Sequence, residues 1–184
     1  MSIDSKAVMK KIIINNGVAL GIISILFSVI SYVMGNQIQP HWSVQLIGFL
    51  TFIYFILSGV NAFKKEKGGF LKLGEALKIG LGIALVSAII GVIYFVIFTQ
   101  FIETNYFVEY ADWQRDTVLE SRPNATDAEI KQIDAGMEMQ KPFMNTGVFA
   151  AVQLMMGLFL GFIISLIGGL FMKKDDPYEH VQQD

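Results

Sequence analysis

Four long blocks without charged side chains constrain the fold of this sequence more than any other feature. They cover residues 12–35, 43–63, 79–102 and 147–172, and each has at least 21 residues without Asp, Glu, Lys or Arg. Because an α-helix rises about 1.5 Å per residue, about 20 residues cross a hydrocarbon core about 30 Å thick. We therefore predict an all-α membrane protein with four transmembrane helices, at about 12–35, 43–63, 72–102 and 146–172.

The composition argues against a soluble helical domain. Hydrophobic residues make up 53% of the chain and charged residues only 16%, whereas an average soluble domain has about 25% charged residues. Surface helices of soluble proteins also carry a polar face, which these blocks lack. The first block is too long for the apolar part of a signal peptide, about 7–15 residues, and no small-x-small cleavage pattern follows it. We interpret it as the first transmembrane helix.

The distribution of charge predicts how the helices cross the membrane. Short connections rich in Lys and Arg stay in the cytoplasm. The connection at 36–42 has no Lys or Arg, and the segment 103–146 has nine acidic against four basic residues, a net charge of −5. We predict two hairpins in a bacterial inner membrane, with both termini and the connection at 64–78 in the cytoplasm. The lysines that support this orientation are Lys6, Lys10, Lys11, Lys64, Lys65, Lys67, Lys72, Lys78, Lys173 and Lys174.

The lysine-rich connection resembles a phosphate-binding loop only in part. Gly69 and Gly74 have the glycine spacing of that motif, but Glu75 stands where its lysine would be. A carboxylate at this position repels phosphate, so the motif is rejected.

Two interpretations of this connection stay open. In the first, Gly68 and Gly69 end the second helix, the next apolar residues lie in the membrane interface, and the lysines extend to anionic lipid headgroups. In the second, the connection is a flexible turn. The first interpretation places Phe70, Leu71, Leu73 and Leu77 in the interface, and it makes membrane lipids the expected partners of Lys64, Lys65, Lys67, Lys72 and Lys78.

Small residues at helical spacing predict which helices pack closely, because helices in lipid associate where their backbones can approach. The stripes are Gly17, Gly21, Ser24, Ser28, Ser31 and Gly35 in the first helix; Gly80, Ala84, Ser87 and Gly91 in the third; and Gly147, Gly157, Gly161, Ser165, Gly168 and Gly169 in the fourth. We expect these three helices to meet tightly and the second to pack more loosely. Its aromatic residues Phe49, Phe52, Tyr54 and Phe55 are expected to face lipid. Similar spacing in the two hairpins also leaves open an internal duplication.

The acidic segment 103–145 is predicted to be a helical insertion outside the cytoplasm. Aromatic residues continue the helical spacing of the third helix, which we expect to run on from 72 to about 120 before Arg122-Pro123 stops it. Thr126 and Glu129 form a capping-box pattern, which predicts a second short helix ending at about Gln140. The aromatic residues are Tyr106, Phe107, Tyr110 and Trp113, and the expected apolar stripe of the second helix is Ile130, Ile133 and Met137. Residues 1–174 would form one membrane domain, followed by a cytoplasmic tail at 175–184.

No pattern in the sequence points to a reaction. The only candidate acid–base pair is Glu75 with Lys78, which an ordinary ion pair one helical turn apart explains. We predict no catalytic residue, no cofactor and no metal site, since the carboxylates lack calcium-loop spacing. The remaining interpretation is a structural or interaction protein of the cell envelope, with an envelope protein or a second copy as partner and no nucleic acid. The alternative is a small transporter or channel subunit that acts as an oligomer.

One stretch also resembles a known family. Residues 69–80, GFLKLGEALKIG, precede an aromatic outer segment, and the last helix ends GGLFMKK at 168–174. This layout is similar to the domain of unknown function 4199 (DUF4199) family of small four-helix inner-membrane proteins of Gram-negative bacteria, over about residues 8–174. The resemblance implies an inner-membrane location and an outer loop between the third and fourth membrane helices. It implies no activity.

Overall fold

The computed structural model describes residues 3–174, which are almost entirely helical. The predicted tail at 175–184 lies outside the described residues. Four stretches, Ser5–Val33, Trp42–Glu66, Leu73–Ile102 and Thr146–Met172, are long and apolar enough to cross a membrane, which confirms the four predicted helices. The elements are α1 (Ile3–Val33), α2 (Trp42–Glu66), α3 (Leu73–Ile97), the π-helix η1 (Phe98–Ile102), α4 (Tyr106–Glu120), α5 (Asp127–Gln140), the 3₁₀-helix η2 (Lys141–Phe143) and α6 (Thr146–Met172).

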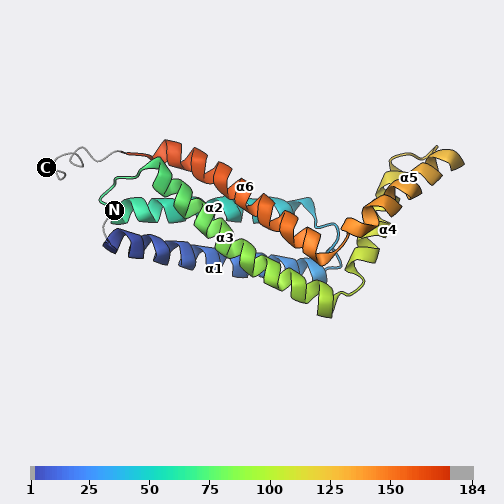
Figure 1. Cartoon of the computed structure of the whole chain (residues 1–184), viewed down its shortest axis with the longest axis horizontal. Coiled ribbons are helices and arrows are strands. Elements are labelled where there is room, and N and C mark those ends of the chain that lie inside the picture. The colour runs from blue at the N-terminus through green and yellow to red at the C-terminus, as the bar shows by residue number, and fades with distance from the viewer. Residues whose placement is uncertain (1–2, 175–184) are drawn as a thin grey trace.

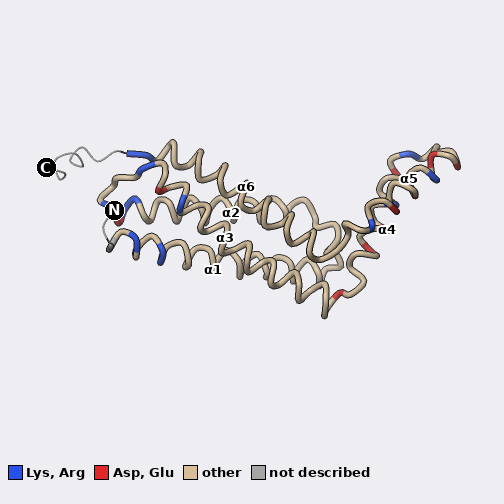
Figure 2. Tube along the Cα trace, in the orientation of Figure 1, with Lys and Arg blue, Asp and Glu red and all other residues tan. Residues whose placement is uncertain are grey.

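The four long helices lie side by side, and α4 and α5 project from one end of them (Figure 1). The beginning of α1 and the end of α6 lie at the opposite end of the bundle. Figure 2 shows that the charges outside α4 and α5 gather mainly at that opposite end, where Lys and Arg predominate. The long middle parts of the helices carry none. The fold therefore separates a lysine-rich end from an end that carries the acidic projection.

Helix α3 lies at the centre of the packing, with its most extensive contacts to α1 and α6. Glycines make both contacts possible. A Cβ atom at Gly21 of α1 would lie 2.9 Å from the Ile90 Cβ of α3, and one at Gly161 of α6 would lie 2.5 Å from the Ala84 Cβ of α3. Real Cβ atoms essentially never approach so closely. The prediction of tight packing is confirmed for the third membrane helix with the first and with the fourth, but among the described residues α1 and α6 make no extensive contact with each other.

The stripe of small residues in α1 does not continue as a contact surface along the whole helix. Ser24 and Ser28 are exposed, and the Ser24 hydroxyl donates to the carbonyl of Leu20 in its own helix, at 2.9 Å. Gly35 ends α1 instead of packing, with a left-handed φ of 71°. The close contact of α1 with α3 is made at Gly17 and Gly21, where a Cβ atom would lie 2.6 Å from the Val86 Cβ and 2.9 Å from the Ile90 Cβ, and further along the stripe only Ser31 is buried. The prediction was wrong for Ser24, Ser28 and Gly35.

The buried core lies towards the lysine-rich end. It contains Ile56, Val60 and Phe63 of α2 together with Ile79 and Ile83 of α3, each at most 1% exposed. Helix α2 therefore contributes much of the core, although its contacts with each neighbour are less extensive than those of α3 with α1 and α6. Its aromatic residues are divided: Phe49 and Tyr54 are exposed, as expected for lipid-facing residues, whereas Phe52 and Phe55 pack against the core.

The expected continuation of the third helix to about residue 120 is interrupted. After α3 the chain widens into η1, where the N–H of Glu103 donates to the carbonyl of Phe98 at 2.8 Å, and α4 begins only at Tyr106. The break lets the Tyr106 ring contact the rings of Phe95 and Phe98, with centroid distances of 5.7 and 6.0 Å. Aromatic pairs of this kind contribute about 0.5–1.5 kcal/mol beyond the area they bury, which favours the bend.

Candidate interaction surface

The projecting hairpin of α4 and α5 is the most polar folded part of the chain, and its second helix begins as predicted. The Thr126 N–H donates to the Glu129 carboxylate at 2.8 Å, and the Glu129 N–H donates to the Thr126 hydroxyl at 3.4 Å. These bonds, chiefly that from the Thr126 backbone, lower the pKa of the Glu129 carboxyl. Helix α5 ends at Gln140, before Pro142. The capping box and both helix ends are confirmed.

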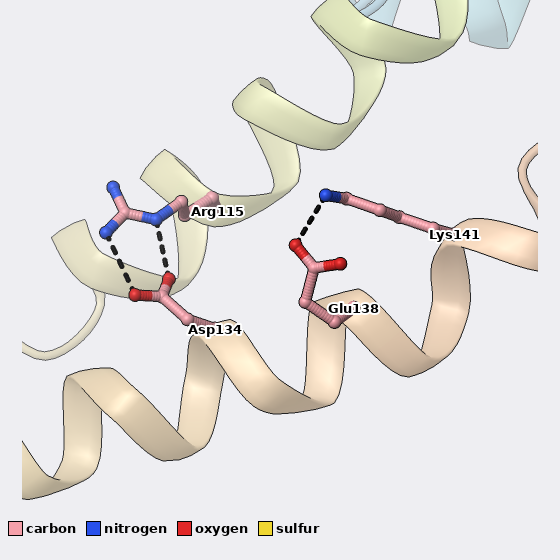
Figure 3. Close-up of polar contacts among 4 residues, drawn as sticks. All are labelled: Arg115, Asp134, Glu138 and Lys141. Carbon is pink, nitrogen blue, oxygen red and sulfur yellow. Dashed lines mark hydrogen bonds and ion pairs between the residues drawn. The ribbon is translucent and has the colours of Figure 1, made fainter.

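A two-pronged ion pair joins the helices of the hairpin. The Arg115 Nε lies 2.7 Å from Asp134 Oδ1, and its Nη2 lies 3.4 Å from Asp134 Oδ2 (Figure 3). Figure 3 also shows Lys141 paired with Glu138 three residues earlier, near the base of the hairpin. An arginine and a carboxylate that meet in this way fix an orientation as well as a distance. The pair therefore sets how α5 lies against α4.

This ion pair keeps its charge at neutral pH. The hydrogen bond from Arg115 lowers the pKa of the Asp134 carboxyl below its ordinary value of 3.8. A carboxyl with a lower pKa in the folded state stabilises that state above its ordinary pKa, and this stabilisation is lost as the pH falls through the lowered value. The hairpin thus keeps this contact at any pH well above 3.8.

An aromatic cluster supports the base of the hairpin. Phe149 of α6 contacts Phe107 and Tyr110 of α4, each with ring centroids 5.3 Å apart, and Phe107 also contacts Phe95 of α3 at 6.4 Å. Burial, and secondarily the neighbouring Tyr110, raises the pKa of the Tyr106 hydroxyl. The predicted aromatic residues of the outer segment therefore converge on one cluster between α3, α4 and α6.

Two hydrogen bonds attach α4 to the connection between α1 and α2. The Gln37 side-chain amide donates to the Glu109 carboxylate at 3.4 Å, and the Trp113 indole N–H donates to the Gln39 side chain at 3.3 Å. Sequence reasoning missed both, because they join residues more than 70 positions apart. They attach the lysine-free connection at 36–42 to α4 at the same end of the bundle.

The outward surface of the hairpin combines acidic and apolar side chains. Asp112, Asp116 and Glu120 are exposed and follow one another at four-residue spacing along one face of α4. Val108 of α4 is 62% exposed and Met139 of α5 is 77% exposed. Large apolar side chains that stay in solvent next to charged ones are typical of a contact surface. We call Val108, Asp112, Asp116 and Glu120, which share this face of α4, the hairpin surface.

The lysine-rich end contains an ion pair that differs from the expected one. Glu75 is only 8% exposed, and its carboxylate lies 2.7 Å from the Lys67 ammonium and accepts the Lys72 N–H at 3.0 Å. Lys78, which the spacing had paired with Glu75, is exposed. The carboxylate turns back over the first turn of α3, where it satisfies a free N–H of the helix start.

The connection between α2 and α3 agrees with neither open interpretation in full. Gly68 and Gly69 end α2 with left-handed φ values of 71° and 91°, as the first interpretation predicts. Leu71, however, is fully buried, and its N–H and carbonyl pair with Lys174 after α6, at 2.9 and 3.0 Å. Placing Leu71 in the membrane interface was wrong. A backbone pair to a residue more than a hundred positions away leaves no local signal in the sequence.

Helices, charges and hairpin together define a class: an all-helical protein with four helices suited to a membrane and an acidic helical projection at one end. The particular family follows from comparison with known families. The family model described as "Protein of unknown function (DUF4199)" matches residues 15–174, and the chain belongs to this family. Neither a curated protein nor a solved structure matches the chain.

Proposed function

We propose that this chain is a bacterial inner-membrane protein that presents its α4–α5 hairpin outside the cytoplasm as a docking surface for an envelope protein. The observation that carries the proposal is an exposed acidic surface on a hairpin attached firmly at its base. Short connections that lack Lys and Arg are the ones that cross the membrane. The connection at 36–42 has neither residue, and it is bonded to α4. Both termini then lie in the cytoplasm.

The charge of the hairpin surface indicates the chemistry of the partner. Asp112, Asp116 and Glu120 form no ion pair within the part of the chain that the structure describes. A partner with basic side chains would complement them, and complementary charge raises the rate and specificity of association. Val108, one helical turn before Asp112 on the same face of α4, supplies an apolar contact beside the charges.

The chain acts in this proposal by contact and not by catalysis. Three buried hydroxyls of the membrane helices bond to carbonyls of their own helices, and that of Thr99 also lies 3.0 Å from the Thr146 hydroxyl of α6. The hydroxyls of Ser87, Thr99 and Ser165 donate to the carbonyls of Ala84, Phe95 and Phe162, at 3.0, 3.0 and 3.1 Å. Hydroxyls bonded to their own helix backbone stabilise or bend helices and do not need a substrate.

Photo-crosslinking in cells tests the proposal. A photoreactive residue in place of Asp116 should give a discrete adduct with another protein. The same residue in place of Tyr54, which is 65% exposed on α2, should not. Reversing the neighbouring charges with D112K and E120K should abolish the adduct. Equal adducts from both positions would contradict the proposal, and solute flux through liposomes containing only this chain would favour the transporter alternative.

A further inference from the structure

A groove between α2 and α6 opens on the outer side of the bundle in its lysine-rich half. It has a volume of about 1010 Å³, at the upper end of the range of about 300–1,000 Å³ for ligand sites. Its walls are mainly apolar. The residues that line it include Leu50, Tyr54, Leu57 and Asn61 of α2 and Ile167 and Phe171 of α6.

The length of the groove corresponds to one leaflet of a bilayer. Leu50 and Asn61 are eleven residues apart in α2, which is about 16 Å along the helix axis. The hydrocarbon core of a bilayer is about 30 Å thick, so this distance is about half of it. Tyr54 and Phe171 are 65% and 88% exposed at the sides of the groove, which leaves it open to the surrounding membrane.

Cationic side chains continue the groove at its polar end. Asn61 is the last α2 residue that lines it, and Lys64 and Lys65 follow at three and four residues, on the same helix face. Neither lysine is paired with a carboxylate among residues 3–174. On α6, Met172 is the last lining residue and Lys173 follows directly. Figure 2 shows Lys and Arg at the end of the bundle where α2 and α6 end.

We propose that the groove holds one anionic phospholipid, with an acyl chain along α2 and α6 and its phosphate against Lys64 and Lys65. The apolar walls fit the chain, Ser58 and Asn61 lie where the ester groups would be, and the lysines complement the phosphate. Lys67 takes no part, because its ammonium is bonded to Glu75 at 2.7 Å. This site lies at the opposite end of the bundle from the hairpin surface. The lipid proposal is therefore independent of the proposed docking function, and either can fail without the other.

Native mass spectrometry of the full chain in detergent, with phosphatidylglycerol or phosphatidylcholine added, tests this site. The chain should retain phosphatidylglycerol at least about tenfold more than phosphatidylcholine. The K64Q/K65Q variant should lose this preference. The K10Q/K11Q variant, which removes the same charge from exposed positions of α1, should keep it. The I167W variant should lose both lipids without a change in thermal unfolding, because Ile167 is 52% exposed in the groove wall.

Three results would overturn the proposal. Equal retention of phosphatidylglycerol and phosphatidylcholine would show that charge plays no role. If K10Q/K11Q lost the preference for phosphatidylglycerol as fully as K64Q/K65Q, the preference would come from the overall positive charge at this end of the bundle. The chain has no cysteine, so I167C can be crosslinked without background. Crosslinked pairs that exclude lipid would show that a second copy fills the groove.

Discussion

Replacing Gly161 with leucine should destabilise the folded bundle by about 3 kcal/mol or more. A Cβ atom at this position would lie 2.5 Å from the Ala84 Cβ and 3.6 Å from the Gly80 carbonyl oxygen. The Gly80 oxygen is a backbone atom of α3, and the Ala84 Cβ is bonded directly to that backbone. No side-chain rotation can therefore relieve the clash. The two helices must separate, which disrupts the most extensive helix contact in the molecule. Unfolding in mixed detergent, followed by circular dichroism, measures the loss.

The control for this change is Gly48→Leu in α2. No atom lies within 4 Å of a Cβ built at Gly48. Leucine is about 1 kcal/mol more favourable than glycine inside a helix, so this variant should be as stable as the natural chain or slightly more stable. If G161L unfolded at the same detergent fraction as G48L, the close packing of α3 against α6 would be contradicted.

Replacing Glu75 with alanine should cost about 2 kcal/mol. Its carboxylate accepts the Lys72 N–H at the start of α3 and bonds to Lys67, whose side chain is only 28% exposed. Alanine leaves a helix-start N–H and a partly buried ammonium without their acceptor. Amide hydrogen exchange should become faster at the start of α3 and in the connection before it.

Glu66→Ala provides the matched control, because Glu66 is exposed and lies next to Lys67 in the sequence. Losing this carboxylate should leave exchange in α3 unchanged and alter stability by less than about 0.5 kcal/mol. Equal effects of the two variants would mean that the buried position of Glu75 contributes nothing beyond its charge.

Periodic and local features of this chain could be predicted from its sequence. The four membrane-length helices follow from charge-free blocks, the glycine contacts of α3 from spacing, and the start of α5 from the Thr126–Glu129 pattern. Each depends on residues within a few helical turns. The same holds for the end of α2 at Gly68 and Gly69, where two adjacent glycines permit left-handed backbone.

Features that depend on distant residues could not be predicted. The bend after α3 brings Tyr106 into aromatic contact with Phe95 and Phe98. The spacing of apolar residues is the same for a straight and a bent helix, so it could not reveal the bend. The pairing of Leu71 with Lys174 and the bonds that hold α4 have no local pattern. The groove proposed to hold a lipid is visible in the sequence only in part. The spacing of Asn61, Lys64 and Lys65 shows that they share one face of α2, but the other wall of the groove belongs to α6, whose position the sequence does not give.

Cysteine accessibility tests most directly whether the hairpin and the lysine-rich end lie on opposite sides of the membrane. Thr117 in α4 and Glu66 at the end of α2 are exposed, and the chain has no cysteine of its own. In spheroplasts, T117C should react with a membrane-impermeant maleimide at once, and E66C should react only after the membrane is permeabilised. Immediate labelling of E66C with protection of T117C would contradict the orientation, and with it the docking surface outside the cytoplasm.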